Sequence, residues 1–182
     1  MTDIETPVSL TIDGREVSVP AGTSIHKAFE SAGIETPTLC WAENLTPVSV
    51  CRVCVVEVEG ARALVPSCAR PAEEGMAVET DSERVRHSRK MVLEFLGSGV
   101  DLSQATDLAA WIDHYGAEPD RYDQPEVPAQ RISEQPKIQD DLYIRDYDKC
   151  VLCYKCVEAC GDDAQHTFAI AVSGRGFDAR IS

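Results

Sequence analysis

Eight cysteines in two groups of four constrain this 182-residue chain more than any other feature. The first group has the spacing C-x10-C-x2-C-x13-C and the second has C-x2-C-x2-C-x3-C. In a reducing compartment, cysteines at such spacings are metal ligands more often than disulfides. The sequence therefore predicts two metal centres, whose candidate ligands are Cys40, Cys51, Cys54 and Cys68 for one and Cys150, Cys153, Cys156 and Cys160 for the other.

The second group lies in "KCVLCYKCVEACGDD", a spacing that is typical of a 4Fe–4S cluster. In two-cluster ferredoxins the fourth Cys of such a run binds the other cluster, and this sequence contains one run. We expect a 4Fe–4S cluster on Cys150, Cys153 and Cys156, with Cys160 as the less certain ligand.

Three sources of the fourth ligand stay open. Cys160 could bend back and complete its own cluster. Asp162, Asp163, His166 or a partner chain could supply the ligand instead. The 182 residues could also be the front of a longer polypeptide that carries a second run.

The first group lies in residues 1–80, which we expect to form a small β-rich domain. "VSLTIDGREVSVP" alternates apolar and polar residues on both sides of Asp13-Gly14, which predicts a hairpin. Residues 23–33 predict a short helix that begins at Thr23 or Ser24 and ends at Gly33. Strands on both sides of Glu59-Gly60 and at 75–80 complete an order that suits a β-grasp fold.

The predicted elements place three of the first four cysteines on a loop after the helix, and Cys68 after a strand. A loop suits a 2Fe–2S cluster, because backbone N–H groups can point at the sulfurs. The alternative is a four-Cys zinc site. Zinc sites usually supply two close cysteine pairs, whereas this group has one pair and two singles, so we favour 2Fe–2S.

Residues 81–140 predict a helical and Pro-rich acidic linker. One helix covers 81–97, with Asp81 or Ser82 as its cap and Gly97 as its stop. A second helix covers 102–116, and a polar, Pro-rich stretch follows. We assign neither His87 nor His114 to a metal, because a lone His on a helix is usually a surface or packing residue.

Residues 141–182 predict a 4Fe–4S ferredoxin-like segment, which makes the whole chain α+β. A short strand leads into Cys150, a turn or short helix runs through Cys160, and two strands flank "SGRG". Arg52 and Lys155 lie inside the two cysteine motifs. Their charges could raise the reduction potential of a nearby cluster, or the side chains could face the solvent, and both alternatives stay open.

Composition excludes several functions. A net charge of −14 argues against a nucleic-acid binder. The acidic start has no apolar segment of a secretory signal, and no apolar run approaches the roughly 18 residues of a membrane span, so we expect a cytoplasmic protein. The chain has no Ser/His/Asp set, P-loop or GxGxxG fingerprint, which favours an electron relay without catalytic residues.

The stretch "TPTLCWAENLTPVSVCRVCVVEVEG…LVPSCARPAEEGMAVET" resembles the N-terminal 2Fe–2S domain of three related subunits. These are the large iron–sulfur subunit of respiratory complex I, the diaphorase small subunit of NAD-linked hydrogenases, and the α subunit of NAD-dependent formate dehydrogenases. The resemblance implies that Cys40, Cys51, Cys54 and Cys68 hold the cluster. Ser49 departs from the pattern, since the family often has Gly there.

The C-terminal part, and above all "TFAI…GRGFDARIS", most resembles formate dehydrogenase α subunits. The complex I relatives hold a further 4Fe–4S cluster in the middle segment through one His and three Cys, but this sequence has no Cys between Cys68 and Cys150. The resemblance implies two partners. One is a flavin-containing, NAD-reactive diaphorase subunit, and the other is a catalytic subunit with molybdenum or tungsten for formate, or nickel–iron for hydrogen.

The resemblance therefore favours an electron-transfer subunit of an NAD-linked, formate dehydrogenase-like complex, with a hydrogenase diaphorase subunit as the alternative within the family. Two other hypotheses stay open. The chain could be a freestanding ferredoxin-like carrier, which its acidic composition fits. It could also be a zinc-stabilised assembly module without a redox role.

Overall fold

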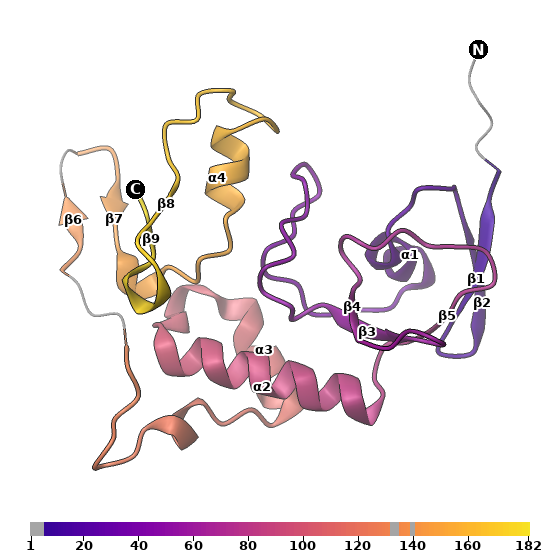
Figure 1. The fold of residues 1–182 in the computed structure, drawn as a ribbon, viewed down its shortest axis with the longest axis horizontal. Coiled ribbons are helices and arrows are strands. Elements are labelled where there is room, and N and C mark those ends of the chain that lie inside the picture. The colour runs from indigo at the N-terminus through magenta and orange to yellow at the C-terminus, as the bar shows by residue number, and fades with distance from the viewer. Residues whose placement is uncertain (1–5, 132–134, 139–140) are drawn as a thin grey trace. The chain divides into compact units, whose positions relative to one another are not determined.

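The computed structural model describes residues 6–131, 135–138 and 141–182. The chain divides into two compact units, one made of Met1–Trp41 and Pro47–Arg89 and the other of Ala42–Thr46 and Lys90–Ser182. Both units mix helices and strands, which agrees with the α+β prediction (Figure 1). The predicted domain boundaries at 80 and 140 stay predictions.

The first unit is built on a five-stranded sheet with the order β2-β1-β5-β3-β4. The central pair, β1 and β5, is parallel, and the other neighbours are antiparallel. The strands are β1 (Val8–Ile12), β2 (Arg15–Val19), β3 (Val55–Val58), β4 (Val65–Pro66) and β5 (Ala77–Glu79).

The predicted hairpin is confirmed, since β1 and β2 pair on both sides of Asp13 and Gly14. Both turn residues have positive φ, 49° and 76°, as a two-residue hairpin turn requires. The Asp13 carboxylate accepts hydrogen bonds from the Thr80 backbone N–H (2.8 Å) and hydroxyl (2.7 Å). These bonds tie the hairpin to the segment that follows β5.

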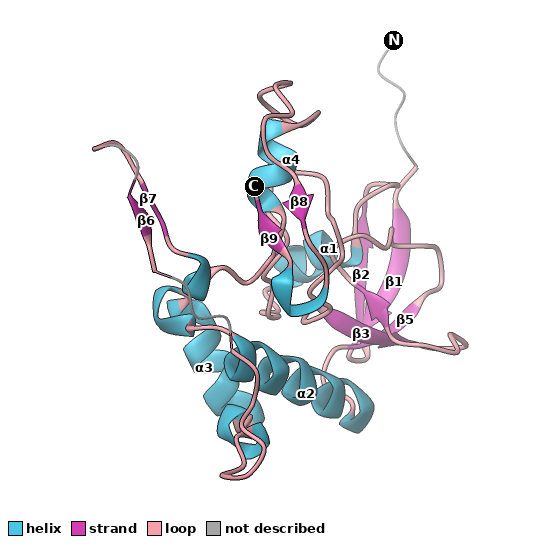
Figure 2. Ribbon diagram, turned by 60° about the vertical axis from the view of Figure 1, so that its left-hand side comes forward, coloured by secondary structure: helices cyan, strands magenta, loops and turns pink. Residues whose placement is uncertain are grey.

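Helix α1 (Ile25–Ala32) lies beside the sheet (Figure 2). Ser24 caps it by accepting a hydrogen bond from the Lys27 N–H, and Gly33 ends it in the left-handed conformation, as predicted. The helix and the sheet enclose one apolar core, which includes Leu10, Ile12, Val19, Ile25, Phe29, Val56 and Val78.

Helix α2 (Glu83–Gly99) begins after Ser82, whose hydroxyl accepts a hydrogen bond from the Val85 N–H. The predicted stop at Gly97 is wrong, because the helix continues to Gly99. A Cβ at Gly97 would lie 2.6 Å from the Pro119 ring. Gly97 therefore allows a close approach of Pro119 to the helix and does not end it.

The predicted helix over 102–116 is divided into a 3₁₀ turn (Leu102–Gln104) and α3 (Thr106–Tyr115). The predicted Pro-rich stretch then begins with a second 3₁₀ turn (Pro119–Tyr122). Glu94 of α2 is fully buried and accepts hydrogen bonds from the Glu118 N–H and the Tyr122 hydroxyl, and its carboxylate pairs with Arg121 at 3.1 Å. A buried carboxylate thus fixes this turn on α2.

The rest of the second unit consists of short elements. They are β6 (Lys137–Ile138), β7 (Ile144–Arg145), a 3₁₀ turn (Tyr147–Lys149), α4 (Lys155–Cys160), β8 (Val172–Ser173), a 3₁₀ turn (Gly176–Asp178) and β9 (Arg180–Ile181). The two predicted strands around "SGRG" are therefore present but short. None of the helices in the described ranges combines the length and hydropathy needed to cross a bilayer.

Candidate metal centres

The first four cysteines gather on two loops and a turn of the first unit. Cys40 follows α1, Cys51 and Cys54 precede β3, and Cys68 follows β4, as the sequence predicted. Three of the side chains are almost completely buried, with exposures of 2% for Cys40, 2% for Cys54 and 1% for Cys68. Cys51 is half-buried.

The four thiols interact with one another in a row. Hydrogen bonds from the Cys51 and Cys68 thiols lower the pKa of Cys40 to about 2, and the same bonds raise the pKa of both donors. The Cys68 thiol also lowers the pKa of Cys54, to about 6. Thiolate is the form that binds metal, and these shared hydrogen bonds show that the four sulfurs lie close to one another.

The loop around Cys51 contains two residues in the left-handed region, Ser49 (φ 59°) and Arg52 (φ 59°). This conformation is costly for a residue with a Cβ and free for glycine. It gives a physical reason why glycine would suit position 49. The Ser49 hydroxyl lies 4.0 Å from the Cys68 sulfur, and the Arg52 side chain is exposed.

The sequence did not predict the buried positions of two residues near this group. His26 is buried on α1, its ring meets the Trp41 ring edge-on at 4.5 Å, and burial lowers its pKa. Arg89 of α2 is 2% exposed and donates a hydrogen bond to the Val55 carbonyl at 2.9 Å. The sequence feature that could have predicted the burial of Arg89 is its position four residues after Val85, on the same face of the helix.

The second group lies in the second unit, where Cys150, Cys153 and Cys156 are close enough to interact. Burial raises the pKa of Cys156, and the neighbouring Cys153 and Cys150 thiols raise it further. Cys150 and Cys156 line a cavity of about 340 Å³ together with apolar side chains that include Ile170 and Ile181.

The backbone of this loop also enters the left-handed region, at Leu152 (φ 51°) and Tyr154 (φ 64°). These two residues are the immediate neighbours of Cys153, whereas Ser49 lies two residues before Cys51 and Arg52 directly after it. Non-glycine residues in such conformations concentrate at functional sites. Both cysteine loops therefore have the strained backbone that is typical of a ligand cradle.

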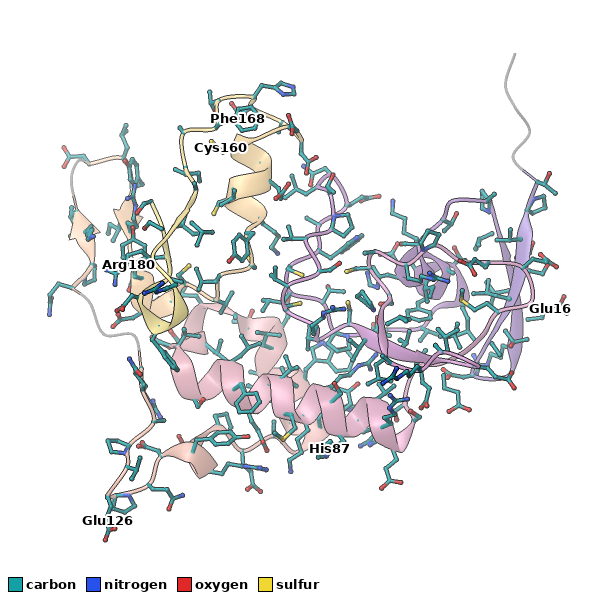
Figure 3. The ribbon with its side chains drawn as sticks, viewed as in Figure 1. Glu16, His87, Glu126, Cys160, Phe168 and Arg180 are labelled. Carbon is teal, nitrogen blue, oxygen red and sulfur yellow. The ribbon has the colours of Figure 1, made fainter. Side chains whose placement is uncertain are left out.

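Cys160 makes different contacts. Its sulfur accepts a hydrogen bond from the Ala169 N–H at 3.1 Å and lies 3.3 Å from the Thr167 hydroxyl, which lowers the pKa of the thiol. Figure 3 shows Cys160 at the end of α4 with Phe168 beside it. The structure therefore places its sulfur against the segment that follows α4.

The alternative ligands for the second group lie as follows. The Asp163 carboxylate accepts hydrogen bonds from the Thr46 N–H (2.6 Å) and hydroxyl (2.9 Å). Asp162 and His166 are exposed. Among the described residues, no three His, Cys, Asp or Glu side chains are grouped closely enough to hold a single metal ion.

The two histidines of the middle segment lie on helices. His87 is exposed on α2 (Figure 3), and the His114 ring packs edge-on against the Tyr115 ring at 4.7 Å. Lys155, the basic residue within the second motif, is half-buried.

Polar contacts hold the residues that directly precede Cys150. Lys149 forms an ion pair with Asp101 and donates to the Ser103 hydroxyl at 2.8 Å, and the pair lowers the pKa of Asp101 to about 2. The Asp101 N–H donates to the Asp148 carbonyl at 2.7 Å. The segment without cysteines thus supports the second cysteine loop.

The donor chemistry of both groups fits iron–sulfur clusters. The first group offers four soft sulfur ligands in a largely buried row, and two sulfurs of the second group line a cavity whose walls are mainly apolar and include Arg145 and Asp146. Cysteine thiolates are the usual ligands of 2Fe–2S and 4Fe–4S clusters.

Family comparisons decide the type of each centre. Residues 5–83 match the family described as "2Fe-2S iron-sulfur cluster binding domain", and residues 143–165 match "4Fe-4S binding domain". The chain has a 2Fe–2S domain and a 4Fe–4S domain. The predicted cofactors, one 2Fe–2S and one 4Fe–4S cluster, are confirmed.

The chain has homologues among NAD(P)-linked oxidoreductase subunits. It is 37% identical to the NADP-reducing hydrogenase subunit HndD of Solidesulfovibrio fructosivorans, an alignment that covers 96% of this chain and 31% of that protein. It is 35% identical to the mitochondrial NADH-ubiquinone oxidoreductase 78 kDa subunit of Candida albicans, over 96% of this chain and 25% of that protein. The chain thus spans less than a third of the length of these curated relatives.

Solved structures agree with these homologues. A chain of the NAD⁺-reducing NiFe hydrogenase in its H₂-reduced state superposes with a TM-score of 0.80 and 26% identity, covering 96% of this chain and 74% of that one. The predicted relationship to complex I and NAD-linked hydrogenase subunits is therefore supported, while formate dehydrogenase is not specifically supported.

The left-handed conformation at Ser49 leads to a prediction about stability. An L-residue there costs roughly 1–2 kcal/mol, and the greater freedom of glycine in the unfolded chain offsets about 0.4–1 kcal/mol of the gain. We expect Ser49→Gly to stabilise the cluster-loaded protein by about 0.5–1 kcal/mol, measured by anaerobic thermal unfolding. Ser18→Gly, in the extended strand β2, is the matched control and should destabilise. A Ser49→Gly variant that unfolds at a lower temperature than wild type contradicts this account.

Proposed function

We propose that the chain is a non-catalytic electron-transfer subunit that relays single electrons between an NAD(P)-reactive flavoprotein and a catalytic oxidoreductase subunit. One observation carries the proposal: residues 5–83 and 143–165 match two different cluster-binding families. The homologues, which are subunits of an NADP-reducing hydrogenase and of NADH-ubiquinone oxidoreductase, support a place in such a complex.

The proposed ligands of the 2Fe–2S cluster are Cys40, Cys51, Cys54 and Cys68. Their mutual hydrogen bonds and burial support the assignment. A bound cluster supplies reversible one-electron chemistry at a potential set by hydrogen bonding, charge and exposure. The role of the protein is to hold the sulfurs, exclude water and set that environment. We also propose a β-grasp classification for this unit, which the parallel β1–β5 pair and the packing of α1 support.

The proposed ligands of the 4Fe–4S cluster are Cys150, Cys153 and Cys156, with Cys160 as a further metal ligand. The contacts of Cys160 with Thr167 and Ala169 support a role away from the other three sulfurs. In two-cluster ferredoxins the fourth Cys of such a run serves the neighbouring cluster. We therefore propose that Cys160 is not required by the cluster that the first three cysteines hold.

Alanine variants test this assignment. We expect Cys153→Ala to abolish the 4Fe–4S signal in electron paramagnetic resonance (EPR) spectra of the anaerobically reduced protein, because a central ligand is lost. Cys160→Ala should keep that signal, and both variants should keep the 2Fe–2S signal as an internal control. Loss of the 4Fe–4S signal in Cys160→Ala would show instead that Cys160 completes its own cluster.

The finer proposal concerns the partners. We propose a flavin-containing diaphorase subunit on one side and a molybdenum- or tungsten-dependent formate dehydrogenase subunit on the other. Formate rests on the resemblance of the C-terminal stretch alone, and a hydrogenase partner is the alternative that HndD supports. The cytoplasmic location stays a prediction.

Anaerobic affinity purification from the native host tests the relay. We expect the tagged chain to bring with it a flavoprotein, and NADH or NADPH to reduce its clusters in that preparation but not in the isolated chain. Analysis for molybdenum, tungsten and nickel then identifies the catalytic partner. Purification of the cluster-loaded chain alone, with no reduction by either nucleotide under any condition, would favour a freestanding carrier.

A further inference from the structure

Arg89 is a charged residue on the buried face of α2, where an apolar residue would be expected. Val85, Arg89 and Leu93 follow one another at four-residue intervals on α2, with exposures of 0%, 2% and 0%. Arginine is almost never fully buried unless it has partners. Its burial needs a reason, because removing the charge from water is costly.

The guanidinium reaches a carbonyl at the edge of the 2Fe–2S loop. Strands β3 and β5 pair with Glu57 opposite Glu79, and this register would place position 81 opposite Val55. Strand β5 ends at Glu79, however, before the chain turns into α2. Arg89 Nη2 donates to the Val55 carbonyl at 2.9 Å, at the point where the ladder stops.

The residue that accepts this hydrogen bond directly follows a proposed cluster ligand in the sequence. Val55 follows Cys54, and the Cys54 carbonyl is itself held by the Ser67 hydroxyl at 2.8 Å. Cys54 and Val55 are 2% and 4% exposed, so little water separates the guanidinium from the cluster loop. Electrostatic interactions are stronger and less screened in such an environment than at the surface.

We propose that Arg89 is a positioning residue that raises the reduction potential of the 2Fe–2S cluster through its buried positive charge. The inference rests on the proposed assignment of Cys54 as a ligand. One-electron reduction adds one negative charge to the cluster site, and a fixed cation nearby stabilises the reduced form. Arg52 lies nearer in the sequence, but its side chain is exposed, so solvent screens its charge.

Three substitutions separate charge from structure. Arg89→Met fills the space with a flexible apolar side chain, Arg89→Gln keeps a neutral donor, and Arg89→Lys keeps the charge. The midpoint potential of the 2Fe–2S cluster is measured in the full chain by redox titration with dithionite and mediator dyes, followed by EPR. We expect more negative potentials in Arg89→Met and Arg89→Gln, and a potential near that of wild type in Arg89→Lys.

Arg52→Gln is the matched control. It removes an exposed charge from the loop that carries Cys51 and Cys54, and it should shift the potential less than Arg89→Gln. If the Arg89→Met variant does not take up the cluster, the midpoint potential of the Arg89→Gln variant tests the proposal instead. The proposal is overturned by a wild-type potential in Arg89→Gln, or by equal shifts in Arg89→Gln and Arg89→Lys. A wrong ligand assignment would be visible separately, as a 2Fe–2S signal that survives in Cys54→Ala.

Discussion

The rigid backbone around Cys54 is the constraint on which the first site depends. Ser67 holds the Cys54 carbonyl, Arg89 holds the next carbonyl along the chain, and strand β3 begins at that point. These bonds join three segments that are distant in sequence: the cysteine loop, the turn that carries Cys68, and helix α2. Because the sulfurs must converge on one buried place, the sheet and the helix together determine the site.

The second site depends on polar contacts from a segment that has no cysteines. This segment contributes an ion pair and hydrogen bonds to the residues next to the cysteine loop. Asp101 and Ser103 hold Lys149, directly before Cys150, while the Tyr147 hydroxyl donates to the Ile181 carbonyl at 2.6 Å. These bonds connect Asp101 and Ile181, which are distant in sequence, to the residues that precede Cys150.

The sequence was sufficient where the signal was local. Cysteine spacing predicted both cofactors, Asp13-Gly14 predicted the hairpin, and Ser24 and Gly33 predicted the ends of α1. Sequence reasoning failed where a distant residue decides the outcome. Gly97 was predicted as a helix stop but accommodates Pro119, and the hydrogen bond from Arg89 to the Val55 carbonyl depends on where strand β5 ends. The left-handed conformation of Ser49 was equally hidden, because only the folded loop shows it.

The central claim is that one chain carries two separate one-electron centres. It is tested most directly by anaerobic coulometric titration of the fully loaded wild-type chain, with EPR and Mössbauer spectra at each step. The account predicts six iron atoms per chain, two in one cluster and four in the other, and two one-electron reductions that appear as different spectral species. A chain that binds zinc at either site, or that accepts only one electron when fully loaded, would contradict it.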